Sequence, residues 1–181
     1  MNFVYETARL QIRILNGTYA DQSLQFYEED RELFEQYEAT RPQNFYTEEY
    51  HRYLMNYEYN QILKGTMMRY WIFLKEEPGK IIGTVSLRNI MHGSYDKCEI
   101  GYKLSSAYQG HGYAREGIAR IIQIAFTELD LHRIEACCMP GNEPSINLLE
   151  SLNFTLEGKL RKFAKIRGQY EDHLLFSLLR P

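Results

Sequence analysis

The chain has 181 residues, a length that suits one folded domain and leaves little room for a second hydrophobic core. Hydrophobic residues make up 44% and charged residues 25% of the chain, which excludes the apolar-poor composition of disordered proteins. The 21 Lys and Arg against 24 Asp and Glu leave a formal net charge of −3, too small for a general nucleic-acid or membrane-surface binder. We therefore expect a single domain over residues 1–181, with no direct nucleic-acid partner and no membrane partner.

The chemistry of the cysteines and histidines points to a reducing compartment and no metal. Cys98, Cys137 and Cys138 form no Cys-x-x-Cys pair, and an odd number of thiols is a poor disulfide framework. The histidines form no His-Glu-x-x-His motif and no closely spaced Cys/His set. The N-terminus has no basic-then-apolar leader, and no apolar run approaches the about 20 residues needed to cross a bilayer. The expected location is the cytoplasm.

The first half of the chain reads as a strand, a helical region and three strands. Residues 9–15 alternate polar and apolar side chains, as a half-buried strand does. Residues 18–65 place apolar and aromatic side chains at helical spacing, with a break at Arg41-Pro42 that predicts two helices. Residues 69–75 and 80–90 flank a Pro-Gly turn as a hairpin, and residues 97–104 follow as a third strand.

The second half alternates helices and strands. Residues 112–129 carry apolar side chains three and four positions apart, which predicts an amphipathic helix. A strand at 133–139, a short helix at 143–152 and two strands at 154–166 and 171–179 follow, the last two around an Arg-Gly turn. This order predicts a mixed α/β fold around one sheet.

A glycine loop joins the strand at 97–104 to the amphipathic helix. The loop reads Gln109-Gly110-His111-Gly112-Tyr113-Ala114. A strand, a glycine loop and a helix in this order aim backbone N–H groups and the positive end of the helix dipole at phosphate oxygens. A plain tight turn is the alternative interpretation. A dinucleotide-binding Rossmann loop is excluded because Arg115 stands where its third glycine belongs, and the chain has no Walker motif.

The loop and its surroundings resemble the GNAT N-acetyltransferase family. Gln109-x-x-Gly112-x-Ala114 matches the signature Gln/Arg-x-x-Gly-x-Gly/Ala of that family. The segments 99–102 (EIGY), 142–145 (Asn-x-x-Ser) and 148–154 (LLESLNF) are similar to the RimJ/RimL-like branch. The chain departs from the pattern at Asn153, where glycine is usual, although Asn also tolerates a left-handed backbone.

The resemblance implies a fold, a reaction and a cosubstrate. The fold would be the GNAT acyl-CoA N-acyltransferase fold, an α/β (α+β) arrangement with a single central, mostly antiparallel sheet and helices on both faces. The activity would be transfer of an acetyl group from acetyl-CoA to a primary amine, first of all the N-terminal α-amine of a ribosomal protein. The family also leads us to expect a homodimer.

The resemblance assigns most site residues to cofactor binding. Backbone amides of the glycine loop would hold the pyrophosphate, and the edge of the preceding strand would hold the pantetheine arm, with help from a side chain at the start of the short helix. The cofactor-binding residues so implied are Ile100, Tyr102, Leu104, Gln109, Gly110, His111, Gly112, Tyr113, Ala114 and Asn142.

Two residues are expected to be catalytic. A protonated amine is no nucleophile, and Glu99 is the candidate to accept its proton, directly or through water. The alternative is that Glu99 is a solvent-facing or ion-paired strand carboxylate. The resemblance makes Ser145 the hydrogen-bond donor to the leaving thiolate, while the alternative is that Asn142 and Ser145 only begin a helix.

The acceptor is less defined by the sequence. The family implies that the helices of residues 18–65 and the final hairpin form the acceptor pocket, and the ten carboxylates at 18–60 would suit a cationic acceptor unless they only form a solvated helix face. Phe45, Tyr46, Tyr50 and Tyr53 are candidates to line it. Two other functions stay open: acetylation of a small amine such as a polyamine or aminoglycoside, and a non-catalytic CoA-binding sensor module.

Overall fold

The computed structural model describes residues 2–181. Eight strands form one sheet in the order β1-β2-β3-β4-β5-β6-β8-β7. The strands are β1 (Val4–Glu6), β2 (Leu10–Arg13), β3 (Met68–Leu74), β4 (Ile81–Met91), β5 (Lys97–Leu104), β6 (Arg133–Cys138), β7 (Thr155–Ile166) and β8 (Gln169–Leu179). The helices are α1 (Ala20–Glu29), α2 (Arg31–Glu35), α3 (Glu48–Leu63), α4 (Tyr113–Thr127) and α5 (Glu143–Ser151). All neighbouring strands are antiparallel except the parallel pair β5 and β6.

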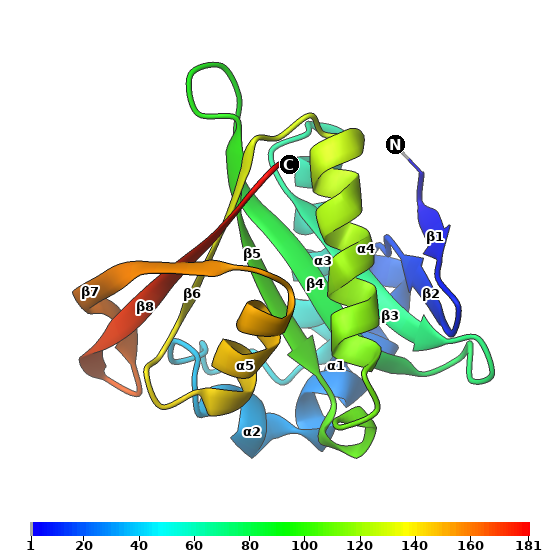
Figure 1. Cartoon of the computed structure of the whole chain (residues 1–181). Coiled ribbons are helices and arrows are strands. Elements are labelled where there is room, and N and C mark those ends of the chain that lie inside the picture. Colours follow the sequence, from blue (N-terminus) through cyan, green and yellow to red (C-terminus); the bar gives the residue numbers. More distant parts are fainter. Residues whose placement is uncertain (1) are drawn as a thin grey trace.

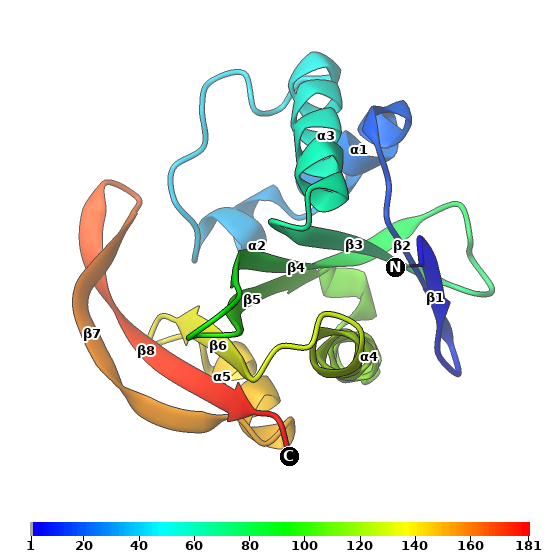
Figure 2. The same ribbon diagram turned by 90° about the horizontal axis from the view of Figure 1, so that it is seen from above.

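The helices cover both faces of this sheet. Seen from above, α1, α2 and α3 lie on one side of the central strands, and α4 and α5 lie on the other (Figure 2). The expected mixed α/β fold, with a single, mostly antiparallel sheet and helices on both faces, is therefore confirmed. None of the helices described in residues 2–181 is long and apolar enough to cross a membrane.

Two apolar clusters hold the layers together. Between the sheet and α4, the helix buries Ile118, Ile121 and Ala125, which recur at helical spacing. On the other face, Phe26, Phe34, Phe45 and their neighbours pack against Trp71 and Phe73 of β3. The apolar stripe that predicted α4 is the surface that this helix buries. In α3 the prediction was wrong, because Tyr53 and Tyr57 are exposed and the helix buries His51, Met55 and Ile62 instead.

The structure differs from the predicted elements at two places. Residues 18–65 form three helices rather than two, because the chain leaves helical conformation at Asp30, between α1 and α2. The Asp30 carboxylate accepts a hydrogen bond from the backbone N–H of Ser106 at 3.0 Å, so a distant loop stabilises this break. The strand β1 was also missed, since three residues are too few to show a period.

The central strands β5 and β6 separate along their length. Their parallel pairing runs only from Lys97 and Arg133 to Glu99 and Glu135. On its other side, β5 stays paired with β4 as far as Leu104. One edge of β5 beyond Glu99 therefore lacks a strand partner, and the sheet opens near its centre, between β5 and β6 (Figure 1).

Candidate active site

The glycine loop is an open backbone cradle at the start of α4. Gly110 and Gly112 both have φ of +78°, a left-handed conformation that side chains beyond glycine disfavour. A Cβ built on Gly110 meets nothing within 4 Å. Arg9, the residue directly before β2, holds the loop from outside: Nη1 donates to the carbonyl of His111 at 2.9 Å, and Nε donates to Glu116 at 2.7 Å. The loop therefore fits an anion that approaches its backbone amides.

A cavity of about 440 Å³ lies beside this loop, and we name it the glycine-loop cavity. It extends from the loop to the end of β5 and the start of α5. Eight of the predicted site residues line it: Tyr102, Leu104, Gln109, Gly110, Gly112, Ala114, Asn142 and Ser145.

Three predicted cofactor residues do not line the glycine-loop cavity. The side chain of Ile100 is buried in the apolar core on the α4 side of the sheet. The rings of His111 and Tyr113 stack on each other, with centroids 5.7 Å apart. His111 Nδ1 also lies 2.8 Å from the carbonyl oxygen of Gln109. The structure therefore does not bring these three residues to the glycine-loop cavity, and Ile100 lines the second cavity described below.

A second cavity, of about 670 Å³, opens on the face of the sheet that carries α1, α2 and α3; we name it the sheet-face cavity. Glu99, Gly101 and Cys137 are among its lining residues. The residues that line both cavities are Tyr37, Glu38, Tyr102, Lys103, Asn142 and Ser145. The two cavities therefore meet where β5 and β6 separate, at the start of α5.

A pair of hydroxyl groups lies at this junction. Tyr102 Oη and Ser145 Oγ are 2.8 Å apart. Burial raises the pKa of Tyr102 to about 12, against a lowering by the hydrogen bond with Ser145, so the phenol stays protonated near neutral pH. The backbone N–H of Ser145 donates to Asn142 Oδ1 at 3.3 Å, so the expected helix start exists beside the hydroxyl pair.

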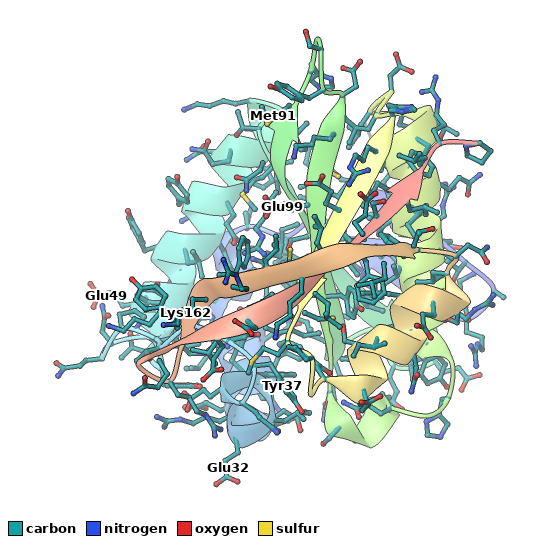
Figure 3. All side chains as sticks on the ribbon, turned by 60° about the vertical axis from the view of Figure 1, so that its left-hand side comes forward. Glu32, Tyr37, Glu49, Met91, Glu99 and Lys162 are labelled. Carbon is teal, nitrogen blue, oxygen red and sulfur yellow. The ribbon has the colours of Figure 1, made fainter. Side chains whose placement is uncertain are left out.

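Glu99 lies on the opposite side of β5 from Tyr102, because successive side chains of a strand point to opposite faces of the sheet. Its half-buried side chain lines the sheet-face cavity, and Oε1 accepts a hydrogen bond from Asn89 Nδ2 at 2.9 Å. Figure 3 shows Glu99 over the central strands of the sheet. Glu99 is therefore positioned to contact a molecule in the sheet-face cavity without contacting Ser145.

The two adjacent cysteines face opposite sides of β6, with Cys137 exposed and Cys138 buried. Burial raises the pKa of Cys137 to about 11 and also raises the pKa of Cys138. Both groups are therefore thiols near neutral pH, which makes them poor nucleophiles.

The acidic helices do not make this cavity acidic, which corrects the expectation of a negatively charged acceptor pocket. Of the ten carboxylates in residues 18–60, Glu38 lines the sheet-face cavity, and it pairs with Lys103 at 2.8 Å and with Arg41 at 2.6 Å. Six are exposed: Asp21, Glu28, Glu29, Glu32, Glu48 and Glu49. Figure 3 shows Glu32 and Glu49 at the periphery, away from the sheet. These carboxylates form a solvated helix face, which was the alternative interpretation.

The aromatic candidates divide in the same way. Phe45 and Tyr50 line the sheet-face cavity. Tyr53 is 68% exposed, and Tyr46 lines a different cavity, where its hydroxyl donates to Glu35. Helical spacing alone did not show which side of the segment faces the sheet.

Three functional candidates were missed from the sequence. Arg9 supports the glycine loop, and Arg115 lines the glycine-loop cavity from the first turn of α4. Tyr102 was predicted only as a cofactor-binding residue, and the pairing of its hydroxyl with Ser145 was missed. The alternation in β5 places Tyr102 on the side of the sheet that carries α5. Within residues 2–181, no group of three or more His, Cys, Asp or Glu side chains is arranged to hold a metal ion.

Comparison with known proteins assigns the chain to a family. Residues 9–155 match the acetyltransferase (GNAT) domain. The chain is 37% identical to the probable N-acetyltransferase YjcK of Bacillus subtilis, over 95% of this chain and 94% of that protein. It is 29% identical to the [ribosomal protein uS5]-alanine N-acetyltransferase of Escherichia coli, over 97% of this chain and 90% of that protein.

Solved structures of acetyltransferases have the same fold as this chain. The ribosomal-protein-S5-alanine acetyltransferase of Vibrio fischeri has a TM-score of 0.92 and 29% identity, covering 99% of this chain and 100% of its own. RimJ of Mycobacterium smegmatis, solved in complex with CoA-disulfide, has a TM-score of 0.88 and 25% identity, covering 94% of this chain and 81% of its own. The chain therefore belongs to the GNAT acetyltransferase family, and it is an N-acetyltransferase of the RimJ-like type.

Proposed function

We propose that this N-acetyltransferase acetylates the N-terminal α-amine of a ribosomal protein, with acetyl-CoA as the donor and residues 1–181 acting as one GNAT domain. The observation that carries the proposal is the meeting of two cavities from opposite faces of the sheet at Tyr102 and Ser145. One cavity begins at a phosphate-type glycine loop, and the other is open to a second molecule. The similarity to uS5-alanine N-acetyltransferases along nearly the whole chain supports a protein N-terminus as the acceptor.

The residues of the glycine-loop cavity fit acetyl-CoA. The left-handed glycines leave the concave side of the loop open for a pyrophosphate, and the cation of Arg115 lies at the same cavity. Between Ile100 and Leu104, β5 has no strand partner on the side of β6, so its backbone groups are free to bond the amides of a pantetheine arm. Asn142 lies across from this edge. Acetyl-CoA, when bound, supplies the activated acetyl group as a thioester.

The proton transfers are assigned to the two sides of β5. Glu99 accepts the proton of the attacking amine from the sheet-face cavity, directly or through water. Ser145, with Tyr102 bonded to it, donates a hydrogen bond to the leaving sulfur at the junction of the cavities. The hydroxyls suit this role because the pKa of Tyr102, raised to about 12 by burial, keeps its proton available.

The experiment is detection of acetyl transfer by intact mass, with ribosomal proteins, N-terminal peptides, polyamines and aminoglycosides as separate acceptors. Addition of 1 acetyl group to a ribosomal-protein N-terminus is the expected result. Transfer only to a polyamine or aminoglycoside would replace the proposed acceptor by a small amine. Binding of acetyl-CoA without transfer to any acceptor would favour the sensor module instead.

A further inference from the structure

The sheet-face cavity is basic although the helices above it are acidic. Its charged lining contains Arg41, Arg69, Arg88 and Lys103 but only 2 carboxylates, those of Glu38 and Glu99. A cavity with this balance attracts an acceptor that carries a negative charge close to its amine.

Three of these four cations are engaged by the protein itself. Lys103 and Arg41 share the carboxylate of Glu38. Arg69 Nη2 donates to Glu58 Oε1 at 2.7 Å in a largely buried pair. Each of these three cations already has a carboxylate partner within the protein, so each is a poorer candidate to bind a substrate anion than a cation without a partner.

Arg88 is different from the other three. Among residues 2–181 its guanidinium has no ion pair or hydrogen-bond partner within the usual distances. Its register neighbour on β5 is Glu99, but Glu99 Oε1 accepts its hydrogen bond from Asn89. Regular pairing of β4 is interrupted directly after Arg88, between Arg88 and Met91. Arg88 is thus a free cation that lines the cavity at its exposed side.

The absence of a side chain at Gly101 lets Arg88 reach the centre of the site. A Cβ built on Gly101 would lie 3.4 Å from Arg88 Nη2 and 3.5 Å from Ser86 Oγ. The guanidinium therefore lies over β5 between Glu99 and Lys103. Arg88 and Cys137 of β6 line the same cavity.

We propose that Arg88 binds a carboxylate of the acceptor, and that the preferred acceptor is a protein N-terminus with Asp or Glu at position 2 or 3. The inference rests on the proposed function, because Glu99 must receive the amine. Arg88 and Glu99 are direct register partners on neighbouring strands, so an amine at Glu99 and a carboxylate at Arg88 come from adjoining residues of one peptide. A guanidinium matches a carboxylate through paired N–H donors, which a lysine does not reproduce.

The test is turnover of three peptides that begin Ala-Glu, Ala-Gln or Ala-Lys and are otherwise identical, with a second set that varies position 3. We expect wild-type kcat/KM to be about tenfold higher for the Glu peptide than for the Gln peptide, as for a charge-assisted pair, and lowest for the Lys peptide. Arg88→Gln should remove the difference between Glu and Gln, and Arg88→Glu should make the Lys peptide the best acceptor.

The control is Arg52→Gln, since Arg52 is an exposed arginine of α3 that does not line the cavity and should keep the wild-type order. Acetyl-CoA affinity, measured for every variant, reports whether the fold is intact. Equal turnover of the peptides by the wild type in both sets, or an unchanged order in Arg88→Glu, would overturn the inference.

Failure of the proposed function would give a separate result. If no peptide is acetylated, calorimetry of the CoA-loaded protein with the same peptides decides the matter. Tighter binding of the Glu peptide that is lost in Arg88→Gln would support the Arg88 site and reject only the acetylation of N-termini. Binding without charge preference, or no binding, would overturn the Arg88 site.

Discussion

Glu99 is the proposed general base; its carboxylate lines the sheet-face cavity. We predict that Glu99→Gln lowers kcat/KM by about 100-fold, because a general base contributes about 10²–10⁴-fold and the amide keeps the size of the side chain. Acetyl-CoA affinity should not change, since Glu99 does not line the glycine-loop cavity. Steady-state kinetics and calorimetry measure the two quantities.

The matched control for Glu99 is Glu49→Gln, an exposed carboxylate of α3 that points away from the sheet (Figure 3). This variant should keep wild-type rates. Full activity in Glu99→Gln would mean that Glu99 is only the hydrogen-bond partner of Asn89.

Ser145 and Tyr102 should act as one unit because their hydroxyls are bonded to each other. We predict that Ser145→Ala lowers kcat about tenfold to 100-fold, and that adding Tyr102→Phe costs much less than its effect alone, as expected for coupled groups. The start of α5 should survive, because the bond to Asn142 comes from the backbone N–H of Ser145.

Ser151→Ala on the same helix is the control, since the exposed Ser151 hydroxyl bonds only the carbonyl of Leu148 among residues 2–181. Independent, multiplicative effects of the two substitutions at Tyr102 and Ser145 would contradict a shared role. Unchanged kcat in Ser145→Ala would leave only the helix-start interpretation of this segment.

In the proposed function, cofactor binding depends on the glycine loop and the start of α4. Valine at position 112 would have to adopt the left-handed conformation, at a cost of about 1–2 kcal/mol, or reshape the loop. We predict that Gly112→Val weakens acetyl-CoA binding at least about tenfold by calorimetry, because the loop binds through its backbone conformation.

Gly79 provides the control for the loop. It lies in an exposed turn, where an added Cβ meets nothing within 4 Å and φ is not left-handed. Gly79→Val should therefore keep acetyl-CoA affinity. An unchanged affinity in Gly112→Val would exclude the glycine loop as the pyrophosphate site.

A buried histidine makes the stability of the whole molecule depend on pH. His51 of α3 is 0% exposed, its Nδ1 lies 2.8 Å from Ser23 Oγ, and Nε2 has no partner in residues 2–181. Burial, together with the charge of Arg41, lowers its pKa from 6.5 to about 4. As pH falls below 6.5 the unfolded chain takes up the proton before the folded chain, so this contribution to stability is complete at pH 7 and is lost down to pH 4.

The expected loss between pH 7 and pH 5 is about 2 kcal/mol of unfolding free energy. Urea titrations at both pH values measure the unfolding free energy. The His51→Asn variant should lose about 2 kcal/mol less than the wild type between pH 7 and pH 5, whatever the stability of the variant at pH 7. An equal pH dependence in wild type and variant would show that His51 takes up its proton in the folded protein.

Much of the fold could be predicted because its elements are long and regular. The apolar period of residues 112–129 predicted α4, and Ile118, Ile121 and Ala125 of that stripe lie in the core. Charge in the helical segment was not predictable in the same way. The sequence shows that this segment is rich in carboxylates. Whether Glu38 or Glu49 faces the sheet depends on how α2 and α3 are oriented against β3 and β4.

The glycine loop, its flanking strand and helix, and the Asn-x-x-Ser start of α5 were sufficient to indicate the family. Each is a short contiguous segment whose local geometry follows from its own residues. The tertiary structure alone decided that Arg9 supports the loop from 102 positions away, that Tyr102 bonds Ser145 across 43 positions, and that Arg88 lies over Gly101. Each of these contacts joins segments that are distant in the sequence, so no local pattern of residues determines it.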